Sequence, residues 1–199
     1  MPLTIARFWV FFTLLAFLVF LPQSASAGMS PEEVKAFEGV KALAERGDAE
    51  AQLNLGLCFD NGSGVAMDQV QAVSWYRKAA EKGYAKAQDR LGTRYRYGLG
   101  VAEDQVQAMS WYRKAADQGD ARAQDRLANH YRHGEGVAKD VIEAYAYLSL
   151  AGTTYELARG RLAALEKQMS GDQIVAGKKR AKELQKEIEA KIAAKAAGK

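Results

Sequence analysis

The stretch DQVQAVSWYRKAA, from Asp68 to Ala80, returns 36 residues later as DQVQAMSWYRKAA, from Asp104 to Ala116. Around it, residues 49–84 and 85–120 agree at 22 of 36 positions, and a third, more diverged copy comes next. A fixed period of this length is typical of stacked-repeat proteins, in which each unit buries its apolar side against its neighbours. The sequence therefore predicts an array of repeats, a fold that usually presents a surface to a partner.

The second copy shows how one repeat is built. A first helix is expected to begin at Ala85, because Ala87, Leu91 and Tyr95 recur at four-residue spacing and form one apolar stripe. Gly92 lies beside this stripe and costs the helix ~1 kcal/mol relative to alanine. Its return as Gly56 in the first copy predicts a crossing where two helix backbones come close.

The second helix of the repeat comes after a glycine turn. Gly98 and Gly100 can adopt the left-handed conformation that ends one helix and reverses the chain. Asp104 can then cap the second helix, with Gln107 completing a capping-box-like pair, and Gly119 ends it. The side chains that we expect this helix to bury are Val106, Ala108 or Met109, Trp111, Tyr112 and Ala115.

Aromatic residues recur as two columns. They are Phe59, Tyr95 and Tyr131 in the first helices and Trp75, Trp111 and Tyr147 in the second helices. Such columns can form a stacking platform for sugar or nucleobase rings. Their helical spacing favours the other interpretation, an aromatic core between repeats.

The two ends of the chain differ from the repeats. Residues 1–27 carry Arg7, an apolar run at 8–21, Pro22 and then Ala25-Ser26-Ala27, a pattern typical of a secretory signal peptide cleaved after Ala27. The apolar run is shorter than the ~20 residues that a membrane-spanning anchor needs. The sequence thus predicts a periplasmic or secreted protein without a transmembrane anchor after cleavage.

The basic character of the chain belongs to its tail. The net charge of the whole chain is +4 and its pI is about 9.1. From Asp172 onward there are eight Lys or Arg residues against four acids, so the tail alone carries +4. The repeats are close to neutral, and a nucleic-acid partner is not expected.

The pattern A-x-A-Q-x-x-L-G-x-x-[FY]-x-x-G-x-G-V-x-x-D-x-x-x-A-x-x-W-[YF]-x-K-A-A-x-x-G resembles the Sel1-like repeat, a family of tetratricopeptide-like solenoids. The resemblance implies an all-α fold, a right-handed α/α superhelical solenoid of about three 36-residue repeats with helical caps. It also implies that the first helices line the concave side, and that the protein is an adaptor or scaffold. The expected organisation is a signal peptide (1–27), an N-terminal capping helix (28–48), repeats at 49–84, 85–120 and 121–156, and C-terminal capping helices with a basic tail (157–199).

Positions that vary between repeats are the candidates for partner binding. On the first helix of the second and third repeats, residues spaced by four share a face and are mostly basic or aromatic. The predicted partner-binding residues are Lys86, Arg90, Arg94, Tyr97, Arg122, Arg126, His130 and His133. We expect this stripe to bind an acidic peptide or protein segment. The alternative is a solvated face partly neutralised by Asp89 and Asp125.

Two further features allow more than one interpretation. His130 and His133 could share a metal ion, but zinc needs more protein ligands than the sequence offers there, so no metal and no cofactor are expected. Cys58, the single cysteine, is either a free thiol open to an intermolecular disulfide or a side chain buried against the N-terminal cap.

The tail carries a narrow apolar stripe of Ala181, Leu184, Ile188 and Ile192. This pattern indicates a last helix that covers the open end of the solenoid to about Leu184, continued by a frayed basic end. The alternative is a projecting helix that docks a partner or an anionic membrane surface.

No catalytic motif such as G-x-S-x-G or H-E-x-x-H is present, and no catalytic residues are expected. The favoured function is a non-catalytic protein-binding adaptor or regulator of the bacterial cell envelope. One alternative is a secreted factor that binds a host or cell-surface protein. A third is a cell-wall protein that binds or hydrolyses muropeptides.

Overall fold

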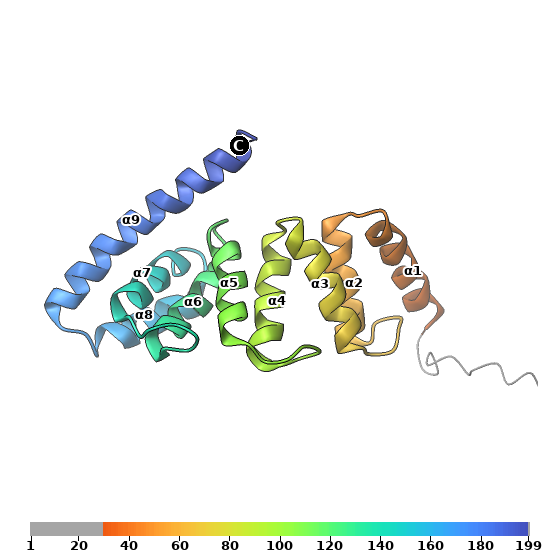
Figure 1. The fold of residues 1–199 in the computed structure, drawn as a ribbon, viewed down its shortest axis with the longest axis horizontal. Helices are drawn as coiled ribbons and strands as arrows, with labels where there is room; N and C mark the ends of the chain where they lie inside the picture. The colour runs from red at the N-terminus through yellow and green to blue at the C-terminus, as the bar shows by residue number, and fades with distance from the viewer. Residues whose placement is uncertain (1–29, 199) are drawn as a thin grey trace, which may run out of the picture.

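The protein is a row of helical hairpins. The computed structural model describes residues 30–198, which contain nine helices and no strand. The helices are α1 (Pro31–Glu45), α2 (Ala49–Asn61), α3 (Gln69–Glu81), α4 (Ala85–Tyr97), α5 (Gln105–Ala116), α6 (Ala121–His133), α7 (Val141–Ala151), α8 (Glu156–Glu166) and α9 (Gly171–Ala196). From α1 to α7 each helix packs on the next in the chain, and α9 returns to pack on α7 (Figure 1). This arrangement is the α/α solenoid that the repeat period predicts.

Each full repeat contributes one A helix and one B helix. The A helices are α2, α4 and α6, to which we add α8, and the B helices are α3, α5 and α7. The three full repeats are the hairpins α2–α3, α4–α5 and α6–α7. The predicted signal peptide lies outside the described residues. No helix within residues 30–198 has the length and apolar character that crossing a bilayer requires.

Aspartate and glycine set the helix ends, as the sequence predicts. Asp104 caps α5 by accepting a hydrogen bond from the Gln107 backbone N–H at 2.9 Å. The Gln107 side chain does not return a bond to Asp104, so the expected capping box forms only in half. The three A helices of the repeats end at glycines in the left-handed conformation, Gly62, Gly98 and Gly134.

The predicted backbone crossing at Gly92 is confirmed. A Cβ atom on Gly92 would lie 2.7 Å from the Tyr112 ring, and a Cβ on Gly56 would meet the equivalent ring of the first repeat. The third repeat has Ala128 at the glycine position and Leu148 at the tyrosine position. The larger side chain on the A helix is thus matched by a smaller one on the B helix.

The aromatic columns lie in the core or pack half-buried against it, so they are not an exposed platform. Tyr147 is 1% exposed and Trp111 is 8% exposed. The rings of Tyr131 and Tyr147 stack with centroids 5.9 Å apart. The expectation for Val106 was wrong: its side chain is 65% exposed. At 3.6 residues per turn, Val106 lies on the face of α5 opposite to the buried Ala115.

The C-terminal helix packs further along its length than the sequence predicts. α9 buries Ala181 and Leu184, but it also buries Ile188, which is 6% exposed. Beyond it, Lys191 pairs with Asp117 at 2.8 Å. The end after Leu184 is therefore helical and in contact with the repeats, because the apolar stripe continues for another turn and basic residues lie beyond it.

Candidate functional site

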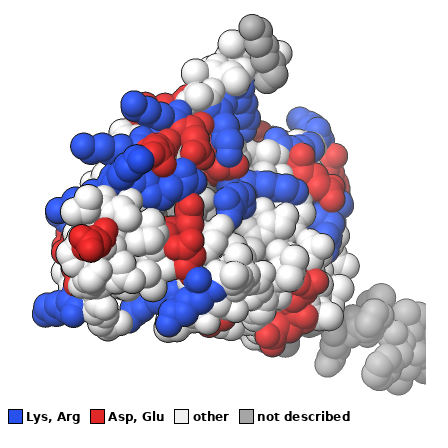
Figure 2. All heavy atoms as spheres, turned by 60° about the vertical axis from the view of Figure 1, so that its left-hand side comes forward, with Lys and Arg blue, Asp and Glu red and all other residues white. Residues whose placement is uncertain are grey.

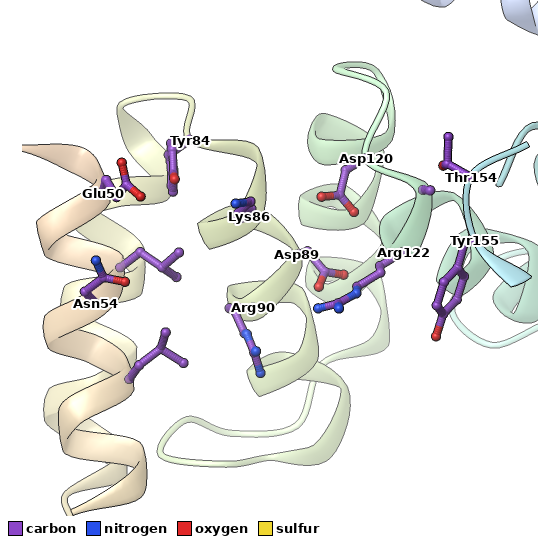
Figure 3. Close-up of a pocket in the computed structure, with 13 residues that line it drawn as sticks. Glu50, Asn54, Tyr84, Lys86, Asp89, Arg90, Asp120, Arg122, Thr154 and Tyr155 are labelled. Atoms are coloured by element: carbon purple, nitrogen blue, oxygen red, sulfur yellow. The ribbon is translucent and has the colours of Figure 1, made fainter. Parts of the chain in front are cut away.

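A groove of about 510 Å³ crosses the face made by the A helices. Its walls come from α2, α4, the start of α6 and residues 154–155 before α8 (Figure 3). The chain brings these segments together because every repeat places its A helix on the same side of the hairpin row. Side chains at equivalent positions of successive A helices therefore face one common space.

Three cations of the predicted stripe line this groove. Lys86 and Arg122 are exposed, and Arg90 is half-buried. Glu50 and Asp120 also line it, so both signs of charge are present (Figure 3). Burial raises the pKa of Asp120 above its ordinary value, since desolvation opposes the charge that its capping role favours.

Ion pairs join consecutive A helices. Asp89 on α4 accepts hydrogen bonds from Arg126 on α6, with 2.6 Å to Nε and 3.4 Å to an η nitrogen. Asp125 on α6 pairs in the same way with Arg161 on α8. Both aspartates are only 4% exposed, so these pairs belong to the interfaces between repeats. Asp89 therefore neutralises Arg126 within the protein, as expected if the stripe is a partly neutralised surface.

Arg94 does not belong to an exposed stripe, which corrects the sequence-based expectation. Its side chain is 12% exposed, pairs with Asp60 on α2 and lies 5.6 Å from the centroid of the Tyr76 ring. The physical reason is helix geometry. Four residues advance about 40° beyond a full turn, so two such steps from Lys86 carry the stripe around into the neighbouring repeat.

His130 is buried for the same reason and is likewise a correction. It is 0% exposed, and its Nδ1 lies 2.8 Å from the carbonyl oxygen of Glu135. Burial lowers the pKa of His130 below its ordinary value of 6.5. His133, three residues on, is exposed and lines a separate pocket. Among residues 30–198, no group of three or more His, Cys, Asp or Glu side chains is placed to hold a metal ion.

A second pocket, of about 310 Å³, continues the same face toward α8. It contains Tyr97 and Arg126 from the predicted set, and it shares Tyr155 with the groove. Arg90 and Arg126 therefore open onto the same side of the molecule. Sequence reasoning missed its other arginines, which are Arg96, Arg132 and Arg161. The recurrence of arginine at positions 96 and 132, one repeat apart, was a signal that could have found two of them.

Cys58 is half-buried on α2 and packs beside the cluster that joins α1 and α2. Burial raises the pKa of its thiol. This placement agrees better with a side chain packed against the N-terminal cap than with an exposed thiol that forms an intermolecular disulfide.

Positive charge on the outside of the array gathers on α9. Figure 2, with the C-terminal end of the array toward the viewer, shows Lys and Arg over the upper part of the molecule with acidic side chains among them. Arg180, for example, bonds Glu143 at 2.6 Å and Glu187 at 2.8 Å. Much of the tail's charge therefore serves contacts within the protein.

The fold and the shared face define a helical-repeat scaffold, and comparison with known proteins identifies its kind. The Sel1 repeat family matches the chain at residues 49–84, 85–120 and 121–153. These matches cover more than half of the sequence, so the chain belongs to the Sel1 repeat family. No curated protein sequence matches it.

Two solved structures are similar. One is c5321, a protective antigen present in uropathogenic Escherichia coli strains and displaying an SLR fold, with 31% identity and a TM-score of 0.73 over 87% of this chain. The other is a Sel1 repeat protein from Oxalobacter formigenes, with 32% identity and a TM-score of 0.65 over 76% of this chain. The chain spans 38% of the first structure and 64% of the second.

Sel1-repeat proteins are generally protein-interaction adaptors, and their fold is typically a non-catalytic scaffold. The A-helix face of this chain carries the groove and, beside it, the arginine-rich pocket. Protein partners are therefore the partner class that the family indicates.

Proposed function

We propose that this protein is a non-catalytic adaptor of the bacterial cell envelope that binds an acidic peptide or protein segment in the groove of its A helices. The observation that carries the proposal is the placement of Lys86, Arg90 and Arg122 around one groove of about 510 Å³. Among the described residues, none of the three forms an ion pair with an acid of this chain. Their charges are thus available to a partner.

The envelope location rests on the signal-peptide pattern at residues 1–27. A secreted factor that binds a host or cell-surface protein is the second candidate, because the similar structure c5321 is described as a protective antigen. Fractionation of cells separates the two functions. An adaptor of the envelope is found in the periplasmic fraction, whereas a secreted factor accumulates in the medium.

The test of the groove is site-specific crosslinking in intact cells. Photo-crosslinking residues are placed at Glu50 and Asn54, which are exposed and line the groove, so that the three cations stay in place. Lys35 and Lys182 are the control positions, since both are exposed and line none of the pockets described above. We expect captured protein from the groove positions only, and equal capture from both sets would contradict the proposal.

The charge requirement is tested separately. The double variant Lys86→Glu and Arg122→Glu is compared with Lys35→Glu and Lys182→Glu, which changes the net charge by the same amount. We expect the groove variant to lose the crosslinked product from a probe at Asn54, an exposed groove residue. If both variants retain it, the basic side chains are only solvated surface.

A further inference from the structure

The ion pairs between A helices keep a fixed register. The acid is the fifth residue of one A helix, and the arginine is the sixth residue of the next. Asp89 and Arg126 occupy these positions on α4 and α6, and Asp125 and Arg161 occupy them on α6 and α8. The two pairs thus form a ladder along the array, with one rung at the α4–α6 contact and one at the α6–α8 contact.

The first interface breaks this ladder. The fifth residue of α2 is Leu53, and the sixth residue of α4 is Arg90. No acid lies within ion-pairing distance of Arg90 in the described part of the chain. The pair that joins α2 and α4 is instead Asp60–Arg94, one to two turns further along the same helices. Arg90 therefore retains the position of a rung without its carboxylate.

The second repeat also lacks the acidic residue that caps the A helix in the other two repeats. The A helices of the first and third repeats are capped by Asp48 and Asp120, whereas the cap residue of α4 is Tyr84. Tyr84 makes no side-chain capping bond, and it lines the groove instead. The second repeat thus replaces a carboxylate with an aromatic ring on the wall that carries Arg90.

The groove wall beside Arg90 is partly apolar, because Leu53 and Leu57 on α2 line it. Tyr84, Glu50 and Asn54 line the groove as well (Figure 3). A ligand for this wall needs an anionic group for the guanidinium and an apolar group for the leucine side. An acidic side chain next to an aliphatic one in a protein segment supplies both.

We propose that Arg90 is the specificity-determining residue of the groove. It binds an Asp or Glu carboxylate of the partner, which completes the missing rung as Asp89 does for Arg126. A neighbouring aliphatic residue of the partner packs on the half-buried Leu57 and Tyr84, since Leu53 is only 7% exposed. This inference rests on the proposed function and names the feature of the partner that the groove recognises. A carboxylate is favoured because carboxylates fill this register at the next two interfaces.

A substitution that supplies the missing carboxylate from the chain itself tests the inference. Leu53→Asp places a carboxylate of the chain itself at the empty rung, where it competes with the partner for Arg90. Leu53→Asn is the matched control, because it removes the same apolar side chain and adds no charge. Arg90→Gln removes the proposed anchor directly.

A library of random 12-residue peptides displayed on phage is selected on the mature protein and on each variant. We expect wild-type protein to enrich peptides with an acid adjacent to an aliphatic residue. The selected peptides, measured by fluorescence anisotropy, should bind Leu53→Asp and Arg90→Gln at least about tenfold more weakly than Leu53→Asn. Thermal melting gives a readout without peptide: Leu53→Asp should melt above Leu53→Asn, and this order should disappear when Arg90→Gln is added.

The outcomes separate this inference from the proposed function. Enriched peptides without acids, or equal binding to Leu53→Asp and Leu53→Asn, would overturn the role of Arg90 and leave a protein-binding groove. No enrichment by wild-type protein would overturn both proposals. Enrichment of acidic peptides that depends on Arg90 and is blocked by Leu53→Asp supports both.

Discussion

Replacing Gly92 with alanine adds a single methyl group at the point where α4 crosses α5. The new Cβ would lie 2.7 Å from two atoms of the Tyr112 ring and 3.1 Å from the carbonyl oxygen of Ala108. The ring cannot move aside easily, since Tyr112 is fully buried and its hydroxyl donates to Thr93 at 3.3 Å. The substitution therefore forces the two helices apart.

The magnitude is set by two opposing effects. Overpacking a filled core costs about 1–3 kcal/mol, whereas exchanging glycine for alanine inside a helix gains about 1 kcal/mol. With a contact this short to a fixed ring, we expect the upper part of the range and a net loss of about 1–2 kcal/mol. For a domain of this size that loss corresponds to a melting temperature lower by about 2–8 °C.

The assay is urea and thermal unfolding monitored by circular dichroism, with Gly39→Ala as the matched control. Gly39 is also inside a helix, but a Cβ there meets no atom within 4 Å. We expect Gly39→Ala to stabilise the protein by about 0.5–1 kcal/mol. If Gly92→Ala stabilises it equally, the crossing does not require glycine and the packing argument fails. Adding Tyr112→Leu should reduce the cost of Gly92→Ala, since the third repeat pairs Ala128 with Leu148.

Three further outcomes are expected. Deleting the residues after Gln185 should cost about 2 kcal/mol of stability, because Ile188 is buried; an unchanged melting curve would show that the far end of α9 does not pack. The pKa of His130 is lowered by burial, so the folded protein binds fewer protons than the unfolded chain just below pH 6.5. The free energy of unfolding should therefore fall as the pH drops through this range. His130→Gln should flatten this pH dependence and His133→Gln should not. A pH-independent free energy of unfolding in the wild-type protein would contradict the burial of His130. The half-buried Cys58 thiol, whose pKa burial raises, should react with a bulky disulfide reagent at least about tenfold more slowly in the folded protein than in urea, and equal rates would refute its burial.

The repeat framework was predictable because the residues that determine it lie close together in the sequence. Asp104 and Gly98 mark helix ends through local hydrogen bonding and backbone conformation, and neither depends on the rest of the fold. The crossing at Gly92 was predictable because its small size recurs at a fixed period. Comparing one repeat with its copy is enough to predict these features.

The surface was harder to predict than the framework. Four-residue spacing puts Lys86, Arg90 and Arg94 on one line, but the line rotates around the helix, so Arg94 enters the interface with Asp60. Whether an arginine is available to a partner also depends on a residue about one repeat away, as Asp89 shows for Arg126. An aligned view of neighbouring A helices would have revealed that Leu53 interrupts the acids, but the energetic meaning of that difference needs the geometry of the interface.

The last helix spans more of the array than any single repeat does. Lys195 lies 3.4 Å from the carbonyl oxygen of Gly83, 112 residues earlier in the chain, and Lys191 reaches Asp117. Because synthesis proceeds from the N-terminus, α9 is made after all the repeats that it contacts. We therefore expect the early hairpins to fold and pack in pairs first. The curvature of the whole array should become fixed only when α9 packs on it. Because α9 does not line the groove, we expect it to influence a bound partner only through the positions of the repeats that it holds together.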